Sequence, residues 1–282
     1  SFDPGYVKGL LDALPYTLRP QARALLVGTR GGFRIQEVRT LGATAIQALE
    51  PTNVLFDLIG AGPYARGAGL RFGQEAPWNL RGAERYDVID LASDFLGQAE
   101  TNKFAFTVEA VQGFLGLLSE RGVLSIPVSI REFTVYAAKM VETTRRALIA
   151  RGVKDPAAHL IVYRSAWNVR ILASPTPFTA ADIAQLKQFA EARSFDTPHF
   201  PGIDPKKISV WNDLPPILLE SDTMQTSEVA QDALRDQVSA LLGPGNVEFL
   251  KANFFDLQPS TLDRPFFYSI LRLEKLPQIL KK

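Results

Sequence analysis

A glycine-rich turn and an acidic residue near the N-terminus have the types and spacing to hold a nucleotide. The stretch VGTRGGF places Gly28, Gly31 and Gly32 after a short apolar run, and Glu50 follows Gly28 by 22 residues. Glycines let a backbone approach a ligand closely, and the start of a following helix points amide groups toward it. An acid at the end of the next strand can accept hydrogen bonds from two ribose hydroxyls. The alternative is a tight turn followed by a surface glutamate.

A nucleotide site of this kind lies in a fold of alternating strands and helices. The sequence shows such an alternation from about Ala22 to Ser174. Short apolar runs predict strands at 22–28, 44–50, 69–73, 85–93, 122–128, 158–164 and 168–174. Helical spacing predicts helices at 3–14, where Pro15 ends the run, and at 33–42, 107–122 and 132–152, with Thr107 as an N-cap and Gly122 just past the end of its helix.

The alternation predicts an α/β fold with a mostly parallel sheet and helices on both faces. The last two strands are close enough in sequence to pair as a hairpin. Together these features predict a Rossmann-like, seven-stranded sheet of the methyltransferase type with one antiparallel strand. We expect residues 1–21 to form a helical lead-in, 22–174 the Rossmann-like domain, and 175–282 a helical and irregular C-terminal extension packed on it. In that extension 179–195 and 227–245 have helical patterns, whereas 196–216 is rich in proline and turns.

Composition excludes several classes of function. The net charge of +1 gives no general electrostatic reason to bind nucleic acid or acidic lipid. The absence of Cys excludes disulfides and thiolate metal sites, and two histidines argue against a histidine metal centre, so we expect no metal. No apolar run reaches the ~18 residues of a membrane helix, and the N-terminus has no signal-peptide pattern. The chain lacks an initiator Met, as a piece of a longer protein would.

Several segments resemble the spermidine synthase branch of the S-adenosylmethionine-dependent methyltransferase fold. They are LLVGTRGGF, LGATAIQALEP, RYDVIDLASDF, FTVEAVQGFLGLLSERGVLSI and RGVKDPAAHLIVYR. The closest resemblance is to the spermidine-synthase-like domains fused to multi-span membrane proteins in bacteria. The segment LDRPFFYSILRLEKLPQIL resembles the one that such proteins carry just before their membrane helices resume. Here we expect Asp263 and Arg264 to form an ion pair that fastens the tail.

The resemblance implies a cofactor, either S-adenosylmethionine or its decarboxylated form, and roles for individual residues. Gly28, Gly31 and Gly32 match the cofactor turn, and Glu50 matches the acid that holds the ribose. The acid at the adenine edge falls on Gln74 or Glu75. The acid that handles the amine nucleophile falls on Asp94, with Asp90 as a competitor inside the strand.

Some residues depart from the pattern of the family. Arg30 stands where a glycine would normally press against the cofactor. Its side chain either fills the pocket, grips a carboxylate or phosphate, or points to solvent. FGQEAPW lacks the usual Gly-Asp-Ala order, only one of the paired acids is present near Asp94, and about 20 residues precede the first strand. These departures argue against polyamine transfer.

The leading functional hypothesis is a domain that binds S-adenosylmethionine or a related nucleoside and transfers a methyl or aminopropyl group to an amine or another small acceptor. The alternative is a non-catalytic sensor or interaction domain of a transporter-like membrane protein, with a degenerate cofactor site. We expect a cytoplasmic location, with membrane segments flanking or associated with the domain. We expect no nucleic-acid partner, and the sequence leaves open whether the protein forms a homodimer.

Overall fold

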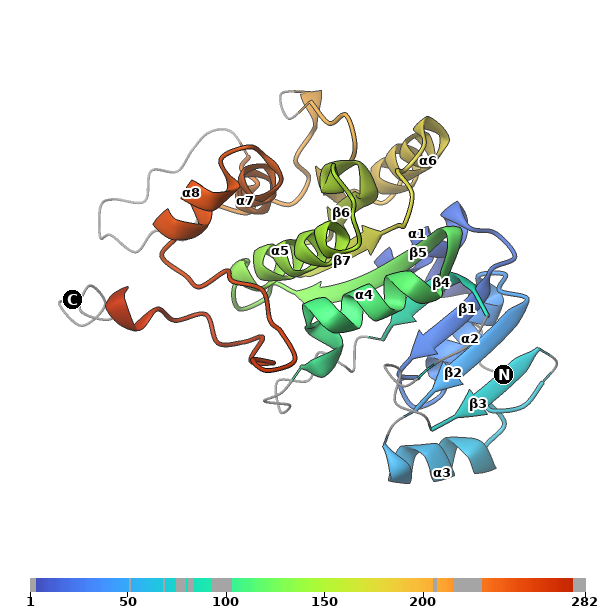
Figure 1. Ribbon diagram of the computed structural model, residues 1–282. Coiled ribbons are helices and arrows are strands. Elements are labelled where there is room, and N and C mark those ends of the chain that lie inside the picture. The colour runs from blue at the N-terminus through green and yellow to red at the C-terminus, as the bar shows by residue number, and fades with distance from the viewer. Residues whose placement is uncertain are drawn as a thin grey trace.

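A computed structural model shows an eight-stranded sheet with helices on both faces (Figure 1). The structure describes residues 4–50, 52–67, 69–74, 80, 84–92, 103–204, 207–215 and 230–275. In spatial order the strands are β3 (Leu70–Gly73), β2 (Ala45–Leu49), β1 (Arg23–Val27), β4 (Tyr86–Leu91), β5 (Leu118–Ser129), β7 (Asn168–Ala173), β6 (Leu160–Arg164) and β8 (Asp196–His199).

The strand order and directions confirm the predicted fold class. Strands β3, β2, β1, β4 and β5 are parallel, and β7 pairs antiparallel with both β5 and β6. The first seven strands thus form the methyltransferase-type sheet. The first strand in the sequence, β1, lies in the middle of the sheet. Strands β2 and β3 follow on one side of it and β4 to β8 on the other, so a topological switch point lies between β1 and β4. Ligands of open α/β sheets bind at the carboxyl ends of the strands at such a point.

Alternating side chains of β1 explain why helices cover both faces. Leu25 and Val27 pack into the larger core with helices α4 (Val108–Leu117), α5 (Val135–Ala150) and α7 (Ala233–Leu242). Ala24 and Leu26 point the other way and pack with α1 (Leu14–Leu18) and α2 (Phe33–Thr40). Successive strand residues face opposite sides, so an apolar run without polar breaks indicates a strand buried on both faces.

The remaining helical elements lie around the sheet and the helices already named. They are η1 (Pro4–Gly9), η2 (Leu11–Ala13), α3 (Asn53–Ala61), η5 (Phe104–Phe106), η6 (Pro156–His159), α6 (Ala180–Glu191), α8 (Asn246–Ala252) and η8 (Leu273–Lys275). Thr107 caps α4, as predicted, with its hydroxyl accepting from the Ala110 amide. Within the ranges described, no helix combines the length and the apolarity needed to cross a membrane.

Three local predictions are wrong. The N-terminal helix expected to end before Pro15 is replaced by two 3-10 helices, η1 and η2, and α1 begins at Leu14 and includes Pro15. The helix expected to reach Gly122 ends at Leu117, and Gly122 lies inside β5, where the pairing with β4 is irregular. A Cβ on Gly122 would come within 2.6 Å of the Tyr86 carbonyl oxygen, so this glycine marks a strand irregularity and not a helix end. The turn-rich segment from Asp196 contains β8, an eighth strand at the sheet edge. Pro198 lies within it, and proline is tolerated on an edge strand.

The C-terminal segment lies along α4 and α5. The Lys103 amide donates to the Pro265 carbonyl at 3.0 Å, and Lys139 Nζ donates to the Ser269 carbonyl at 2.7 Å. Among the described ion pairs none joins Asp263 to Arg264. Asp263 is exposed and accepts a hydrogen bond from Thr261. Backbone carbonyls of the segment therefore help to hold it, and its buried Phe267 and Ile270 pack into the larger core.

Burial lowers the pKa of Lys139 from its usual 10.5 to about 8. Between these two pH values the unfolded chain still carries the proton that the folded chain has lost. The contribution of Lys139 to the free energy of unfolding therefore rises with pH, by roughly 3 kcal/mol at 1.36 kcal/mol per pKa unit. Urea unfolding of the wild type and of Lys139→Met at pH 7 to 10 should give stabilities that diverge in favour of the wild type above pH 8. A constant difference between the two free energies of unfolding across this pH range would contradict the lowered pKa of Lys139.

Candidate nucleoside site

The turn after β1 is tightly folded. Gly28, Arg30, Gly31 and Gly32 all have positive φ angles, of 86°, 51°, 68° and 90°. The amides of Gly32 and Arg34 both donate to the Thr29 carbonyl at 3.0 Å. We expected amides at the start of α2 to point toward a ligand. The structure corrects this, because the left-handed residues fold the turn back so that these amides are used internally.

Glu50 lies beside this turn. The parallel pairing of Val27 with Leu49 brings the carboxyl ends of β1 and β2 together. The Thr29 hydroxyl donates to Glu50 Oε2 at 2.9 Å, and the Thr52 amide donates to Oε1 at 3.3 Å. Glu50 is 3% exposed, so it is not the surface glutamate of the alternative interpretation. An ionised carboxylate has about four acceptor positions, so after these two hydrogen bonds it can still accept from the two hydroxyls of a diol.

The loop after α3 lies over the turn. A Cβ on Gly32 would lie 3.0 Å from Tyr64 Cβ and 3.2 Å from the Ile59 side chain. The Tyr64 ring also contacts the Phe33 ring, with 5.3 Å between centroids. Gly32 is therefore required both by its positive φ and by this close packing, which fixes one wall beside the turn.

Arg30 points away from Glu50. Arg30 Nη1 lies 3.3 Å from Glu37 Oε2 and 3.6 Å from Asp12 Oδ2, and its side chain is 34% exposed. Of the three outcomes considered from the sequence, this arrangement agrees with the grip on a carboxylate. The carboxylates that the guanidinium contacts belong to the protein itself, and the position in front of Glu50 is not filled by Arg30.

Arg30 joins a buried ionic cluster centred on Asp90, a residue of β4. Arg34 donates from Nε to Asp90 Oδ2 at 3.0 Å, and Arg170 Nη1 donates to Oδ1 at 3.2 Å. The Tyr16 hydroxyl donates to Oδ2 at 3.0 Å. Because Asp90 is fully engaged and 1% exposed, it serves as an anchor and is not available as a base.

Asp12 extends the cluster to the N-terminal segment. Its Oδ1 lies 2.6 Å from Arg170 Nη2, and its Oδ2 lies 3.8 Å from Arg34 Nη1. Burial by itself raises the pKa of Asp12, but the charges of Arg170 and Arg34 outweigh it and hold the pKa at about 2. Three arginines (Arg30, Arg34 and Arg170) then balance three carboxylates (Asp12, Glu37 and Asp90).

Two sequence-predicted site residues, Glu75 and Asp94, lie outside the described residues. Gln74, the other candidate for the adenine edge, is described, and its side-chain amide donates to Asn53 Oδ1. The structure thus brings together Gly28, Gly31, Gly32 and Glu50, directs Arg30 elsewhere, and adds Thr29 and Tyr64. Thr29 lies within the quoted turn, but only the pairing of β1 with β2 shows that it faces Glu50.

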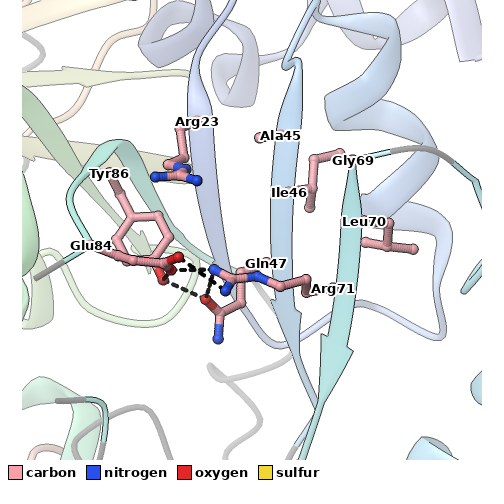
Figure 2. Close-up of a pocket in the computed structure, with 9 residues that line it drawn as sticks. All are labelled: Arg23, Ala45, Ile46, Gln47, Gly69, Leu70, Arg71, Glu84 and Tyr86. Carbon is pink, nitrogen blue, oxygen red and sulfur yellow. Dashed lines mark hydrogen bonds and ion pairs between the residues drawn. The ribbon is translucent and has the colours of Figure 1, made fainter. Parts of the chain in front are cut away.

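A cavity of about 380 Å³ opens at the opposite, amino edge of the sheet, beside the first residues of β1, β2 and β3. Figure 2 shows Arg71 reaching Glu84 and Gln47 across it, with Tyr86 beside them. The hydrogen bond from Arg71 lowers the pKa of Glu84. This cavity is far along the strands from Glu50, and it lies at the edge where α/β sheets do not normally bind ligands.

Comparisons with known proteins concern the fold. No protein-family model matches the sequence, and a search of curated proteins gives no match. Among solved structures, spermidine synthase from Thermotoga maritima is 15% identical over 63% of this chain and 62% of its own, with a TM-score of 0.45. A probable spermidine synthase from Corynebacterium glutamicum is 13% identical over 66% and 70%, with a TM-score of 0.49. Human methyltransferase-like protein 13, solved in complex with SAH, is 13% identical over 72% and 93%, with a TM-score of 0.44.

The aligned part of this chain thus spans less than two thirds of the Thermotoga enzyme. All three TM-scores are below 0.5, so the assignment of fold class rests on the strand order described above.

Asp90→Asn should destabilise the protein by roughly 3–5 kcal/mol, because it leaves buried Arg34 and Arg170 without their shared carboxylate. Asp87→Asn on the same strand is the matched control. Asp87 accepts from Ser119 and from the Arg23 amide near the surface, so its change should cost about 1 kcal/mol. Urea denaturation measures both, and equal losses would contradict the anchoring role of Asp90.

Proposed function

We propose that this chain binds S-adenosylmethionine or a closely related nucleoside through Glu50 and the turn from Gly28 to Gly32, and transfers a group from it. The observation that carries the proposal is the buried Glu50 carboxylate, held by Thr29 at the carboxyl ends of β1 and β2. A fixed carboxylate at that position suits the two ribose hydroxyls.

The turn favours a nucleoside over a dinucleotide. A pyrophosphate is normally bound by free amides at a helix N-terminus. Here the amides of Gly32 and Arg34 already donate to Thr29. Arg30 is directed to Glu37 and Asp12, so it is not placed to hold a phosphate beside Glu50. A ligand without phosphates therefore fits these residues better, which argues against a dinucleotide-dependent oxidoreductase.

When bound, S-adenosylmethionine supplies a sulfonium carbon that is already activated for transfer. The protein then needs to hold the ribose at Glu50, align an uncharged acceptor with that carbon, and receive the proton that the acceptor releases. Asp90 cannot receive this proton, because both its oxygens are engaged by arginines and Tyr16. We assign that role to Asp94, just beyond the end of β4. The acceptor class, the location in the cell, flanking membrane segments and a homodimer stay predictions from the sequence.

Calorimetric titration with S-adenosylmethionine, its decarboxylated form and methylthioadenosine tests the proposal. We expect micromolar binding of at least one of them, and a loss of ten-fold or more in Glu50→Gln, because hydrogen bonds to a charged group contribute ~1.5–3 kcal/mol. Glu84→Gln is the matched control. It removes an acid at the amino edge of the sheet and should leave the affinity unchanged.

Absence of binding by folded protein would reject the proposal and favour the non-catalytic sensor or interaction domain. Equal affinity in Glu50→Gln and the wild type would show that the nucleoside binds elsewhere. If binding holds, loss of turnover in Asp94→Asn with retained affinity would support the role given to Asp94.

A further inference from the structure

A second cavity lies at the carboxyl edge of the sheet, next to the ionic cluster. Its volume is about 380 Å³, and it is bordered by the N-terminal segment at Leu10 and Asp12, by Arg30, and by Asn168 and Val169 at the start of β7. Asn168 pairs with Ser129, the last residue of β5, so this cavity shares the edge at which ligands bind in such sheets. Arg30 and its neighbour Thr29 direct their side chains to different groups, Arg30 to this cluster and Thr29 to Glu50.

The charges that line the cavity favour an anion. Two arginines, Arg30 and Arg170, and one carboxylate, Asp12, line the cavity, whereas Glu37 and Asp90, which also pair with these arginines, do not line it. Arg170 is 2% exposed and donates to Asp12, Asp90 and Ser125, so it is a fixed charge in the floor. Arg30 is the more accessible guanidinium, at 34% exposure. A guanidinium at this position attracts a carboxylate and repels an amine.

The other walls are apolar or neutral. Leu10, Leu11, Pro127, Val169 and Phe195 supply hydrocarbon surface, and the exposed Asn168 stands at the rim. A cavity of about 150 Å³ is enough to hold a benzene ring, and small-molecule sites begin at about 300 Å³. The space therefore suits a compact apolar body attached to one negative charge.

We propose that this cavity binds a small carboxylate with an apolar body, its carboxylate on the Arg30 guanidinium and its body against Leu10, Val169 and Phe195. The inference goes beyond the proposed function, because it requires no nucleoside and uses the side of the turn that Glu50 does not. It also gives a physical reason why a cationic polyamine would be a poor ligand here.

The test compares two probes of similar shape and opposite charge, phenylacetate and phenethylamine, by calorimetry or ligand-observed NMR without any nucleoside present. We expect saturable binding of phenylacetate and none of phenethylamine. No binding of phenylacetate, or equal binding of both probes, would overturn the proposal. Because the nucleoside is absent, the result is independent of whether Glu50 binds one.

Three variants locate the binding. Arg30→Gln should weaken phenylacetate binding ten-fold or more. Asn168→Asp should do the same by placing a negative charge at the exposed rim, where it disturbs no packing. The matched control is Arg146→Gln, which removes a largely exposed arginine of α5 that is paired with Glu142 and should leave binding unchanged. Wild-type affinity in both Arg30→Gln and Asn168→Asp would overturn the assignment to this cavity.

Discussion

The carboxylate of Asp90 is the interaction on which the arrangement of this site depends. Two arginines and a tyrosine from three different segments converge on it, Arg34 from α2, Arg170 from β7 and Tyr16 from α1. Buried ions are costly unless they are paired and hydrogen-bonded, so the cluster fixes these segments in one arrangement. Through Asp12 it also fastens the N-terminal segment across the carboxyl edge of the sheet.

This cluster explains how an arginine can occupy a cofactor-type turn. Arg30 adopts a left-handed backbone conformation that costs a non-glycine residue ~1–2 kcal/mol. Its guanidinium gains Glu37 and Asp12 as partners, which offsets part of that cost. The same contacts carry its side chain away from Glu50. The turn consequently has two chemically different sides, one with a buried carboxylate and one with a cavity that two arginines line.

The fold was predictable because its signal is local. The apolar run of β1 indicated a strand buried on both faces, and the alternation of strands and helices with a closing hairpin indicated the type of sheet. The nearness of Glu50 to the turn also followed from the sequence, since parallel neighbours bring their carboxyl ends together. The ionic cluster around Asp90 did not, because its members Asp12 and Arg170 are separated by 158 residues and are brought together only by the folded chain. Strand β8 was missed because Pro198 breaks the strand pattern that an interior strand would show. The roles of Glu75 and Asp94 stay predictions.

A crystal structure of the protein with S-adenosylhomocysteine would test the central claim most directly. The account predicts ribose hydroxyls within hydrogen-bond distance of Glu50, with the Arg30 guanidinium still on Glu37 and Asp12. Density showing that guanidinium against the ligand or in front of Glu50, or no ligand at Glu50 at saturating concentration, would contradict it.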